Sequence, residues 1–280
     1  MEFGLIEQYI NKLNIELKLN KASEKTKFVY TYFVKKFLLN LDKLPEKATE
    51  YDVKAFLAKN IDNYSTKSYA LLLSSLRFFF KYIIKSNAMI DIRTPKIEKE
   101  IKDVLTQEEV KSLIEISPNY KSKLIISMLY STGLRISELV SLNKQDLNLE
   151  RHQGIVKKGK GKKDRLLFFS KELVEPLSKY LKTVQGDFVF PGWKGNKMHP
   201  RNVQNLLNRL KIKAKITKKV SPHTLRRSYA THLHEEGVDI RLIQVFLGHS
   251  RIDTTEHYVD VSTKTLKDVK NPFDSLKIKI

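Results

Sequence analysis

Apolar residues recur at helical spacing through the first 90 residues of the chain. They fall three or four positions apart, the period of one face of an α-helix, in four successive stretches. The stretches span residues 5–17, 23–39, 49–57 and 69–83. Thr49 and Asp52 have the spacing of a helix start and mark the beginning of the third. The pattern predicts a small helical bundle over residues 1–90, with no residue in it that looks catalytic.

Aromatic residues are prominent in the second of these helices. The expected apolar stripe contains Phe28, Tyr32, Phe33 and Phe37. Such rings could form a core or could stack on exposed bases. We expect them to form the core of the bundle, because they fall at helical spacing.

The apolar period lapses over residues 91–104, where charges alternate around Pro95. This composition is typical of a linker. Thr106 and Glu109 then stand three residues apart before an apolar run, the pattern of a capping box at a helix start. We therefore expect a second domain over residues 105–280.

The second domain combines helical stretches with two short β-type runs. Helices are expected at about 120–131, ended by Gly133, from Arg135, and at about 171–183, 200–210, 224–236 and 239–247. The runs at 155–156 and 166–168 flank residues 157–165 and predict a hairpin whose tip carries six basic residues and one aspartate. Glycines on both sides of Lys160 allow the tip to turn. The expected fold class is mainly α with a small β-hairpin or sheet (α+β).

Charge and composition narrow the choice of partners. Lysine and arginine number 52 against 31 acidic residues, a net charge of +21 over 280 residues, and the excess extends over both domains. Such an excess of positive charge favours binding to polyanions such as DNA, although a need for solubility can produce the same composition. Without cysteine there are no disulfides, and structural zinc is not expected. The start lacks a signal-peptide core and no apolar run is long enough for a membrane span, so we expect a soluble cytoplasmic protein.

Residues suited to phosphate chemistry occur in five segments of the second domain. They are Arg135 before Ile136-Ser137-Glu138, Lys160 between two glycines, His223 and Arg226 in His-Thr-Leu-Arg, His249 in Leu-Gly-His-Ser, and Tyr258. Each has an ordinary alternative: Arg135 could pair with Glu138 on a helix surface, and His249 could cap the helix that ends at Leu247. Their joint occurrence favours one site.

This set contains what DNA strand cleavage without water requires. A tyrosine can attack phosphorus and conserve the bond energy in a covalent phosphodiester. Two guanidiniums can bind the non-bridging oxygens as their charge grows, and a lysine or histidine can protonate the departing oxygen. No metal or other cofactor is needed for these steps.

The order and spacing of these segments resemble the tyrosine recombinases, especially the Xer recombinases of bacteria and archaea, from about residue 105 to 262. The resemblance implies a SAM-like core-binding domain followed by a catalytic domain. It also implies that Tyr258 forms a 3′-phosphotyrosine, Arg135 and Arg226 bind the phosphate, Lys160 protonates the leaving oxygen, His223 acts as acid/base and His249 donates a hydrogen bond. Lys162 and Lys163 remain alternatives to Lys160 as the general acid, and His257 is either a bystander or a DNA contact. Arg201 and Arg227 are further candidate phosphate contacts.

The resemblance further implies a duplex recombination site as the partner, with four protomers on two sites and a Holliday junction between the strand exchanges. Chromosome dimer resolution at a dif-like site is the expected role, with any accessory protein unidentified. A mobile-element integrase, a type IB topoisomerase and a non-catalytic DNA-binding regulator are the alternatives.

The chain continues past Tyr258 for 22 residues, in which apolar and lysine residues alternate around Pro272. This tail is too short to form its own core, so its apolar side must dock elsewhere. We expect it to pack on a neighbouring protomer, and docking on its own catalytic domain is the alternative.

Overall fold

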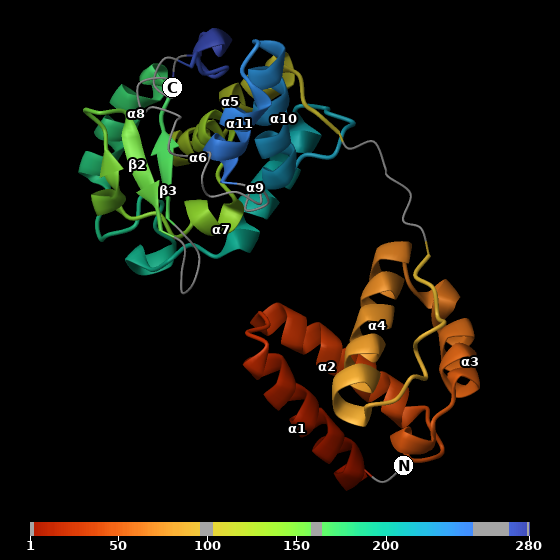
Figure 1. The fold of residues 1–280 in the computed structure, drawn as a ribbon. Helices are drawn as coiled ribbons and strands as arrows, with labels where there is room; N and C mark the ends of the chain where they lie inside the picture. Colours follow the sequence, from red (N-terminus) through yellow and green to blue (C-terminus); the bar gives the residue numbers. More distant parts are fainter. Residues whose placement is uncertain (1–2, 96–102, 158–163, 249–268, 279) are drawn as a thin grey trace. The chain divides into compact units, whose positions relative to one another are not determined.

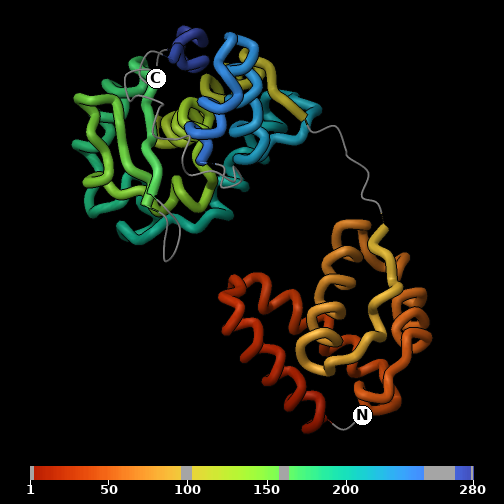
Figure 2. The backbone as a smooth tube through the Cα atoms, viewed as in Figure 1, coloured from red at the N-terminus to blue at the C-terminus, as the bar shows by residue number. Residues whose placement is uncertain are grey.

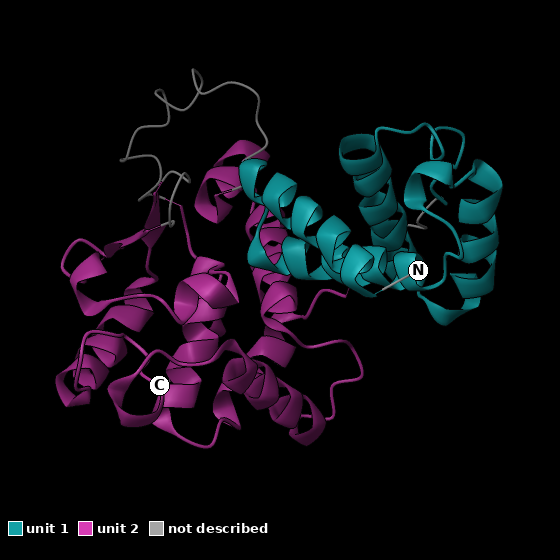
Figure 3. Cartoon of the chain, turned by 90° about the horizontal axis from the view of Figure 1, so that it is seen from below, with its two compact units in different colours: residues 1–100 teal, residues 101–280 magenta. Residues whose placement is uncertain are grey.

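The computed structural model describes residues 3–95, 103–157, 164–248, 269–278 and 280 (Figure 1). The chain forms two compact units, Met1–Glu100 and Ile101–Ile280 (Figure 3). The domain limits expected from the sequence, 1–90, 91–104 and 105–280, remain a prediction. In the described part of the chain no helix is both long and apolar enough to cross a membrane.

The first unit is a helical bundle. Its helices are α1 Phe3–Leu19, α2 Glu24–Leu39, α3 Glu50–Asn60 and α4 Thr66–Phe79, with short 3₁₀ turns at Pro45–Lys47 and Ile61–Asn63 and a π-helical turn at Phe80–Ile84. The predicted start of α3 is confirmed, because the Asp52 carboxylate accepts from Thr49 N at 2.7 Å and Asp52 N donates to Thr49 Oγ1 at 3.4 Å. Rings of Phe37, Phe79 and Phe80 meet edge to face in the core.

Two of the aromatic residues expected in this core lie outside it. Phe28 is 75% exposed and Tyr32 is 52% exposed, whereas Phe33 and Phe37 are buried. The buried face of α2 consists of Phe33, Val34, Phe37 and Leu38. The expectation was wrong for Phe28 and Tyr32 because a helix rich in apolar residues offers two overlapping stripes, and only packing selects one.

Residues beyond α4 stay attached to the first unit. Ala88, Met89 and Ile92 are buried in its core. Arg77 donates from Nη1 to Thr94 Oγ1 at 2.7 Å and from Nη2 to the carbonyl of Ile92. The segment expected to be a linker thus begins as part of the bundle.

The second unit is mostly helical and contains a small antiparallel sheet (Figures 1 and 2). Its α-helices and strands are α5 Gln107–Glu115, α6 Tyr120–Thr132, α7 Ile136–Leu139, β1 Leu147–Asn148, β2 Gln153–Val156, β3 Arg165–Phe168, α8 Lys171–Thr183, α9 Pro200–Lys213, α10 Pro222–Glu235 and α11 Ile240–Leu247. Short 3₁₀ turns occur at Lys144–Asp146, Trp193–Gly195 and Asp274–Leu276. The mainly helical fold with a β-hairpin is confirmed, and the predicted capping box at Thr106 and Glu109 is present.

The sheet has the strand order β1-β2-β3, in which Gly154 pairs with Leu167 and Val156 with Arg165. The two-residue strand β1 was not expected from the sequence. Arg165 was expected at the hairpin tip, but it is the first residue of β3 and only 9% of its surface is exposed. Tip residues 158–163 lie outside the described residues.

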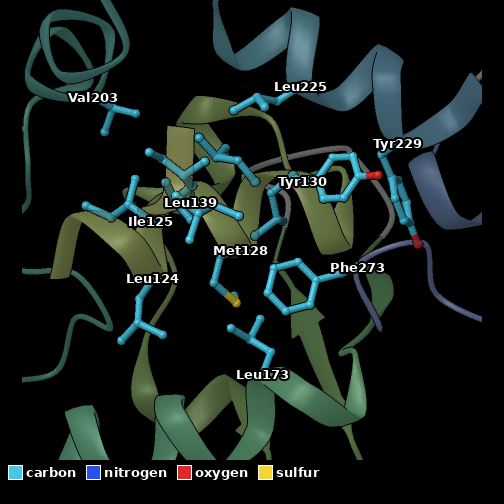
Figure 4. Close-up of a cluster of buried hydrophobic side chains, with 14 of the residues drawn as sticks. Leu124, Ile125, Met128, Tyr130, Leu139, Leu173, Val203, Leu225, Tyr229 and Phe273 are labelled. Atoms are coloured by element: carbon cyan, nitrogen blue, oxygen red, sulfur yellow. The ribbon is translucent and has the colours of Figure 1, made fainter. Parts of the chain in front are cut away.

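Helix α6 runs through the centre of the second unit and packs against α5, α8 and α10. Every residue from Leu124 to Thr132 is buried. Figure 4 shows side chains of several elements meeting here, among them Met128 of α6, Leu173 of α8 and Leu225 of α10. This core holds the loop after α6 and the first turns of α10 in fixed places.

The C-terminal segment returns to the same core. Phe273 and Leu276 are 2% and 4% exposed, and Phe273 belongs to the cluster around Met128 and Leu173 (Figure 4). Asn271 Nδ2 donates to the carbonyl of Ser131 at 2.7 Å. The expectation that the tail docks on a neighbouring protomer was therefore wrong for residues 269–278, which pack on their own catalytic unit. Residues 249–268 lie outside the described residues.

Candidate active site

The fold brings Arg135 and Arg226 together from distant parts of the chain. Arg135 lies at the N-cap of α7, immediately after the turn that ends α6, and Arg226 lies near the start of α10. The turn depends on Gly133, which has φ +59°. A Cβ at this position would stand 2.6 Å from Leu247 Cδ2 and 3.0 Å from Tyr229 Cδ1, so only glycine allows α11 and α10 to approach the turn.

Arg226 is held by two main-chain carbonyls. Its Nη1 donates to Gly133 O and its Nη2 to Leu247 O, both at 2.5 Å, and the residue is 6% exposed. Burial, followed by the positive charges of Arg135 and Arg165, lowers the pKa of the Arg226 guanidinium to about 10. The group is still charged at neutral pH, and an anion beside it would relieve the repulsion.

Glu138 lies between two of the arginines. One carboxylate oxygen is 2.8 Å from Arg135 Nη1, and the other accepts from Arg135 N and from Arg165 Nη2, each at 2.9 Å. Burial alone raises the pKa of Glu138, but the charge of Arg165 and the hydrogen bonds from Arg135 outweigh it, and the pKa is lowered. Glu138 is therefore a fixed negative charge.

We call Arg135, Arg165, Arg226 and Glu138 the arginine cluster. Its three guanidiniums and one carboxylate leave a net charge of +2 in a largely buried place. Charges in a poorly solvated environment interact more strongly than charges in water. The Arg135 side chain is the most open of the four, at 34% exposure, and gives the cluster access to a ligand. The arrangement can bind a phosphate diester and stabilise added charge on its oxygens.

Of the other four site residues predicted from the sequence, the structure describes His223. His223 is exposed in the first turn of α10, one turn before Arg226, where Ser221 caps the helix by accepting from Thr224 N at 3.1 Å. Lys160, His249 and Tyr258 lie outside the described residues, as do Lys162, Lys163 and His257. The described chain leaves α11 at Gly248, whose carbonyl is 3.4 Å from Arg135 Nη2.

Two members of the cluster were not predicted in these roles. Glu138 was considered only as a surface partner of Arg135, and Arg165 only as one charge of the hairpin tip. The sequence does contain a signal for Arg165, which directly precedes the apolar run Leu166–Phe168 and so can enter the strand. Its buried contacts depend on α7 and α11 and have no local sequence pattern.

The two further candidate phosphate contacts, Arg201 and Arg227, differ in their surroundings. Arg201 is exposed at the start of α9, and Arg227 donates from Nη1 to the carbonyl of Asp103 at 2.7 Å.

In the parts of the chain that the structure describes, no group of three or more His, Cys, Asp or Glu side chains is arranged to hold a metal ion.

Helix α9 packs against α7, whose N-cap residue is Arg135, and against α10, which carries Arg226 (Figure 1). It buries Val203, Leu206, Leu207 and Leu210. Its other face presents amides and guanidiniums and no carboxylate: Arg201, Asn202, Gln204, Asn205, Asn208 and Arg209. Its three asparagines and Arg209 line a shallow hollow. Asparagine weakens a helix relative to alanine, so the buried residues of α9, and not this polar face, hold the helix in place.

Comparisons with known proteins show the family to which the chain belongs. Residues 103–265 match the phage integrase family, and residues 6–89 match the N-terminal SAM-like domain of phage integrases. Tyrosine recombinase XerA of Pyrococcus furiosus is 39% identical over 275 residues, which cover 95% of this chain and 94% of that protein. Tyrosine recombinase XerD of Oceanobacillus iheyensis is 34% identical over 288 residues, covering 94% of this chain and 96% of its own.

Solved structures show the same fold. A crystal structure of XerA recombinase covers 98% of this chain and 100% of its own, with 27% identity and a TM-score of 0.52. A λ integrase dimer bound to a COC′ core site covers 87% of this chain and 94% of its own, with 20% identity and a TM-score of 0.73. The chain thus belongs to the phage integrase family and is a tyrosine recombinase of the Xer type, an enzyme that breaks and rejoins DNA.

Proposed function

We propose that this recombinase acts at a dif-like chromosomal site and resolves chromosome dimers, with Tyr258 as nucleophile. The resemblance to Xer recombinases along nearly the whole chain supports this role. In the proposed reaction Tyr258 Oη bonds to the scissile phosphorus and the bond from phosphorus to the 5′ oxygen breaks. His223 serves as acid/base for the phenol proton, Lys160 gives a proton to the 5′ oxygen, and His249 donates a hydrogen bond to the phosphate.

The arginine cluster is the observation that carries the proposed chemistry. A phosphodiester brings one negative charge, and the transition state adds more on its non-bridging oxygens. A preorganised cluster with a net charge of +2 matches this increase without reorganising at the moment of reaction. Arg135 and Arg226 supply the forked donors that suit phosphate oxygens.

DNA contacts are proposed for the polar face of α9 and for exposed basic residues of both units. Asparagine amides pair with adenine edges and arginine with guanine in the major groove. In related structures λ integrase is bound as a dimer to a core site and as a tetramer to a Holliday junction. By analogy, we propose that four protomers of this chain assemble on two duplex sites.

Covalent capture on a suicide substrate tests the chemistry. A nicked duplex with a candidate dif-like site loses the cleaved strand end, so the phosphotyrosine intermediate accumulates. The wild-type protein should give an adduct that denaturing electrophoresis separates from free protein. Tyr258→Phe removes only the attacking oxygen and should bind DNA without forming an adduct. Tyr51→Phe, at an exposed position of the first unit, is the matched control and should react normally.

The adduct assay, together with plasmid-relaxation and two-site recombination assays, distinguishes the proposed role from its alternatives. An adduct that still forms with Tyr258→Phe would show that another residue is the nucleophile. Relaxation of supercoiled plasmid without exchange between two sites would indicate a topoisomerase. Recombination of the ends of a mobile element, with no reaction at the chromosomal site, would indicate an integrase.

A further inference from the structure

We propose that Arg165 is a positioning residue that holds the phosphate-binding arginines in place through Glu138 and through the end of α11. The proposal rests on the proposed function, because it takes Arg135 and Arg226 as the phosphate ligands. Arg165 is not assigned a contact with DNA. It acts on the groups that make such contacts.

The end of α11 is where the three arginines meet. The last carbonyls of a helix have no partner within it and carry the negative end of the helix dipole. Three successive carbonyls here each accept from a different arginine. Phe246 O accepts from Arg165 Nη1 at 2.7 Å, Leu247 O from Arg226 Nη2 at 2.5 Å, and Gly248 O from Arg135 Nη2 at 3.4 Å. The helix end therefore sets the spacing of the cluster.

Arg165 is the only one of the three that reaches this helix end from the sheet. As the first residue of β3 it pairs with Val156, so its backbone is fixed by the hairpin ladder. Its side chain is 7% exposed and bridges Phe246 O to the Glu138 carboxylate, 2.9 Å from Nη2. One guanidinium thus joins β3, α7 and α11.

The charges distinguish Arg165 from Arg226. Among the described residues Arg226 donates to carbonyls, so its positive charge stays available to an anion. The charge of Arg165 is met at close range by Glu138. Glu138 in turn holds Arg135 by its main chain and its side chain. Because Glu138 is largely buried, its carboxylate stays charged and in place only while it is paired with Arg165.

Loss of Arg165 should therefore change how the phosphate is held more than how DNA is bound. Without it, Phe246 O and one Glu138 oxygen lose a donor, and the net charge of the cluster falls from +2 to +1. We expect Arg165→Gln to cleave a phosphate substrate about tenfold more slowly or worse. The direct loss of a preorganised donor costs roughly 10²–10³, and an indirect loss should cost less. Affinity for duplex DNA should stay within about twofold, because many other basic residues bind the backbone.

A substrate with an uncharged scissile group separates positioning from general damage. In a methylphosphonate a methyl group replaces one non-bridging oxygen, which removes the charge that the arginines bind. Single-turnover adduct formation is measured at saturating protein with both substrates. The defect of Arg165→Gln should be at least about tenfold on phosphate and near onefold on methylphosphonate. Equal slowing on both substrates would overturn the proposal, since a distorted site harms both.

Companion variants keep the test decisive. Arg165→Lys retains the positive charge but loses the two separate guanidinium donors that bind Phe246 O and Glu138. It should show a partial defect with the same substrate dependence. Glu138→Gln combined with Arg165→Gln should be no slower than Glu138→Gln alone if Arg165 acts through Glu138. Arg151→Gln, at an exposed position outside the site, should leave both rates unchanged.

A structural measurement does not depend on activity. In a crystal structure of Arg165→Gln, or of Arg165→Lys if the first variant does not fold, the separation between Arg135 Nη1 and Glu138 Oε1 should exceed its present 2.8 Å. An unchanged separation would refute the proposal. Failure of the wild-type protein to form an adduct would instead refute the proposed function, so the two failures are distinguishable.

Discussion

At the scale of single residues, neighbouring arginines of α10 differ in what they can do. Arg226 is buried and donates to the carbonyls of Gly133 and Leu247, whereas Arg227 is less buried and donates to Asp103 O. Arg226→Ala should slow adduct formation by roughly two to three orders of magnitude, the loss expected for one preorganised contact with a developing charge. Arg227→Ala is the matched control and should lose affinity rather than cleavage rate. Single-turnover rates beside binding titrations measure both quantities.

Glu138 gives the cluster a dependence on pH. Its pKa is lowered in the folded protein, so it stabilises the fold above its ordinary pKa of 4.5, and this stabilisation is lost as the pH falls through the folded pKa. At pH 7 the wild-type protein should be more stable than Glu138→Gln, by about 3–5 kcal/mol if the loss resembles that of a buried ion-pair partner. Thermal unfolding from pH 7 to pH 3 should show the difference shrinking below pH 4.5. A difference independent of pH would mean that the charge of Glu138 does not stabilise the fold.

At the scale of elements, prediction from sequence succeeded where periodicity was strong. Helices α1, α4 and α8 carry apolar residues at regular spacing, and their positions agree with expectation. The two-residue strand β1 is too short to show alternation, and it forms by pairing with the edge of β2 that β3 leaves open. The same limit applies to the site. The motifs predicted Arg135 and Arg226 as site residues, and the fold brings them together at the end of α11. The hydrogen bonds of Arg165 connect β3 with α7 and α11, and only tertiary structure creates them.

The C-terminal segment illustrates how packing decides between two sequence-based alternatives. Phe273 fills a place in the core beside α6 and α8, and Asp274 accepts from Glu172 N at 3.4 Å at the start of α8. Phe273→Ala should destabilise the second unit by about 3–5 kcal/mol, the usual cost of removing a buried aromatic ring. Phe28→Ala, which removes the same ring from an exposed face, should cost at most about 0.5 kcal/mol. Calorimetry can follow the unfolding transition of the second unit. If the loss of stability in Phe273→Ala depended on protein concentration, docking between protomers would be favoured instead.

At the scale of the whole molecule, charge serves two different purposes. The net charge of +21 attracts the DNA backbone, and this attraction weakens as salt rises. The arginine cluster is a local, buried excess whose interaction with the scissile phosphate is much less screened. Raising the salt concentration should therefore weaken DNA binding steeply, while the cleavage rate of fully bound substrate changes little.

This division of charge also predicts how cleavage responds to metal ions. A divalent ion assists phosphoryl transfer by neutralising charge on the phosphate oxygens or by activating water. Here a tyrosine is proposed in place of water, and the net charge of +2 in the cluster is positioned for the phosphate oxygens. Adduct formation on a single-site suicide substrate should therefore be the same, within about twofold, in excess EDTA and in Mg²⁺ at equal ionic strength.

A metal-dependent nuclease in the same buffer is the control for chelation, and it should stop in EDTA. The single-site substrate matters because Mg²⁺ also folds branched DNA, so a two-site assay would mix assembly with chemistry. Strict dependence of adduct formation on a divalent ion would contradict the prediction and point to a two-metal mechanism instead.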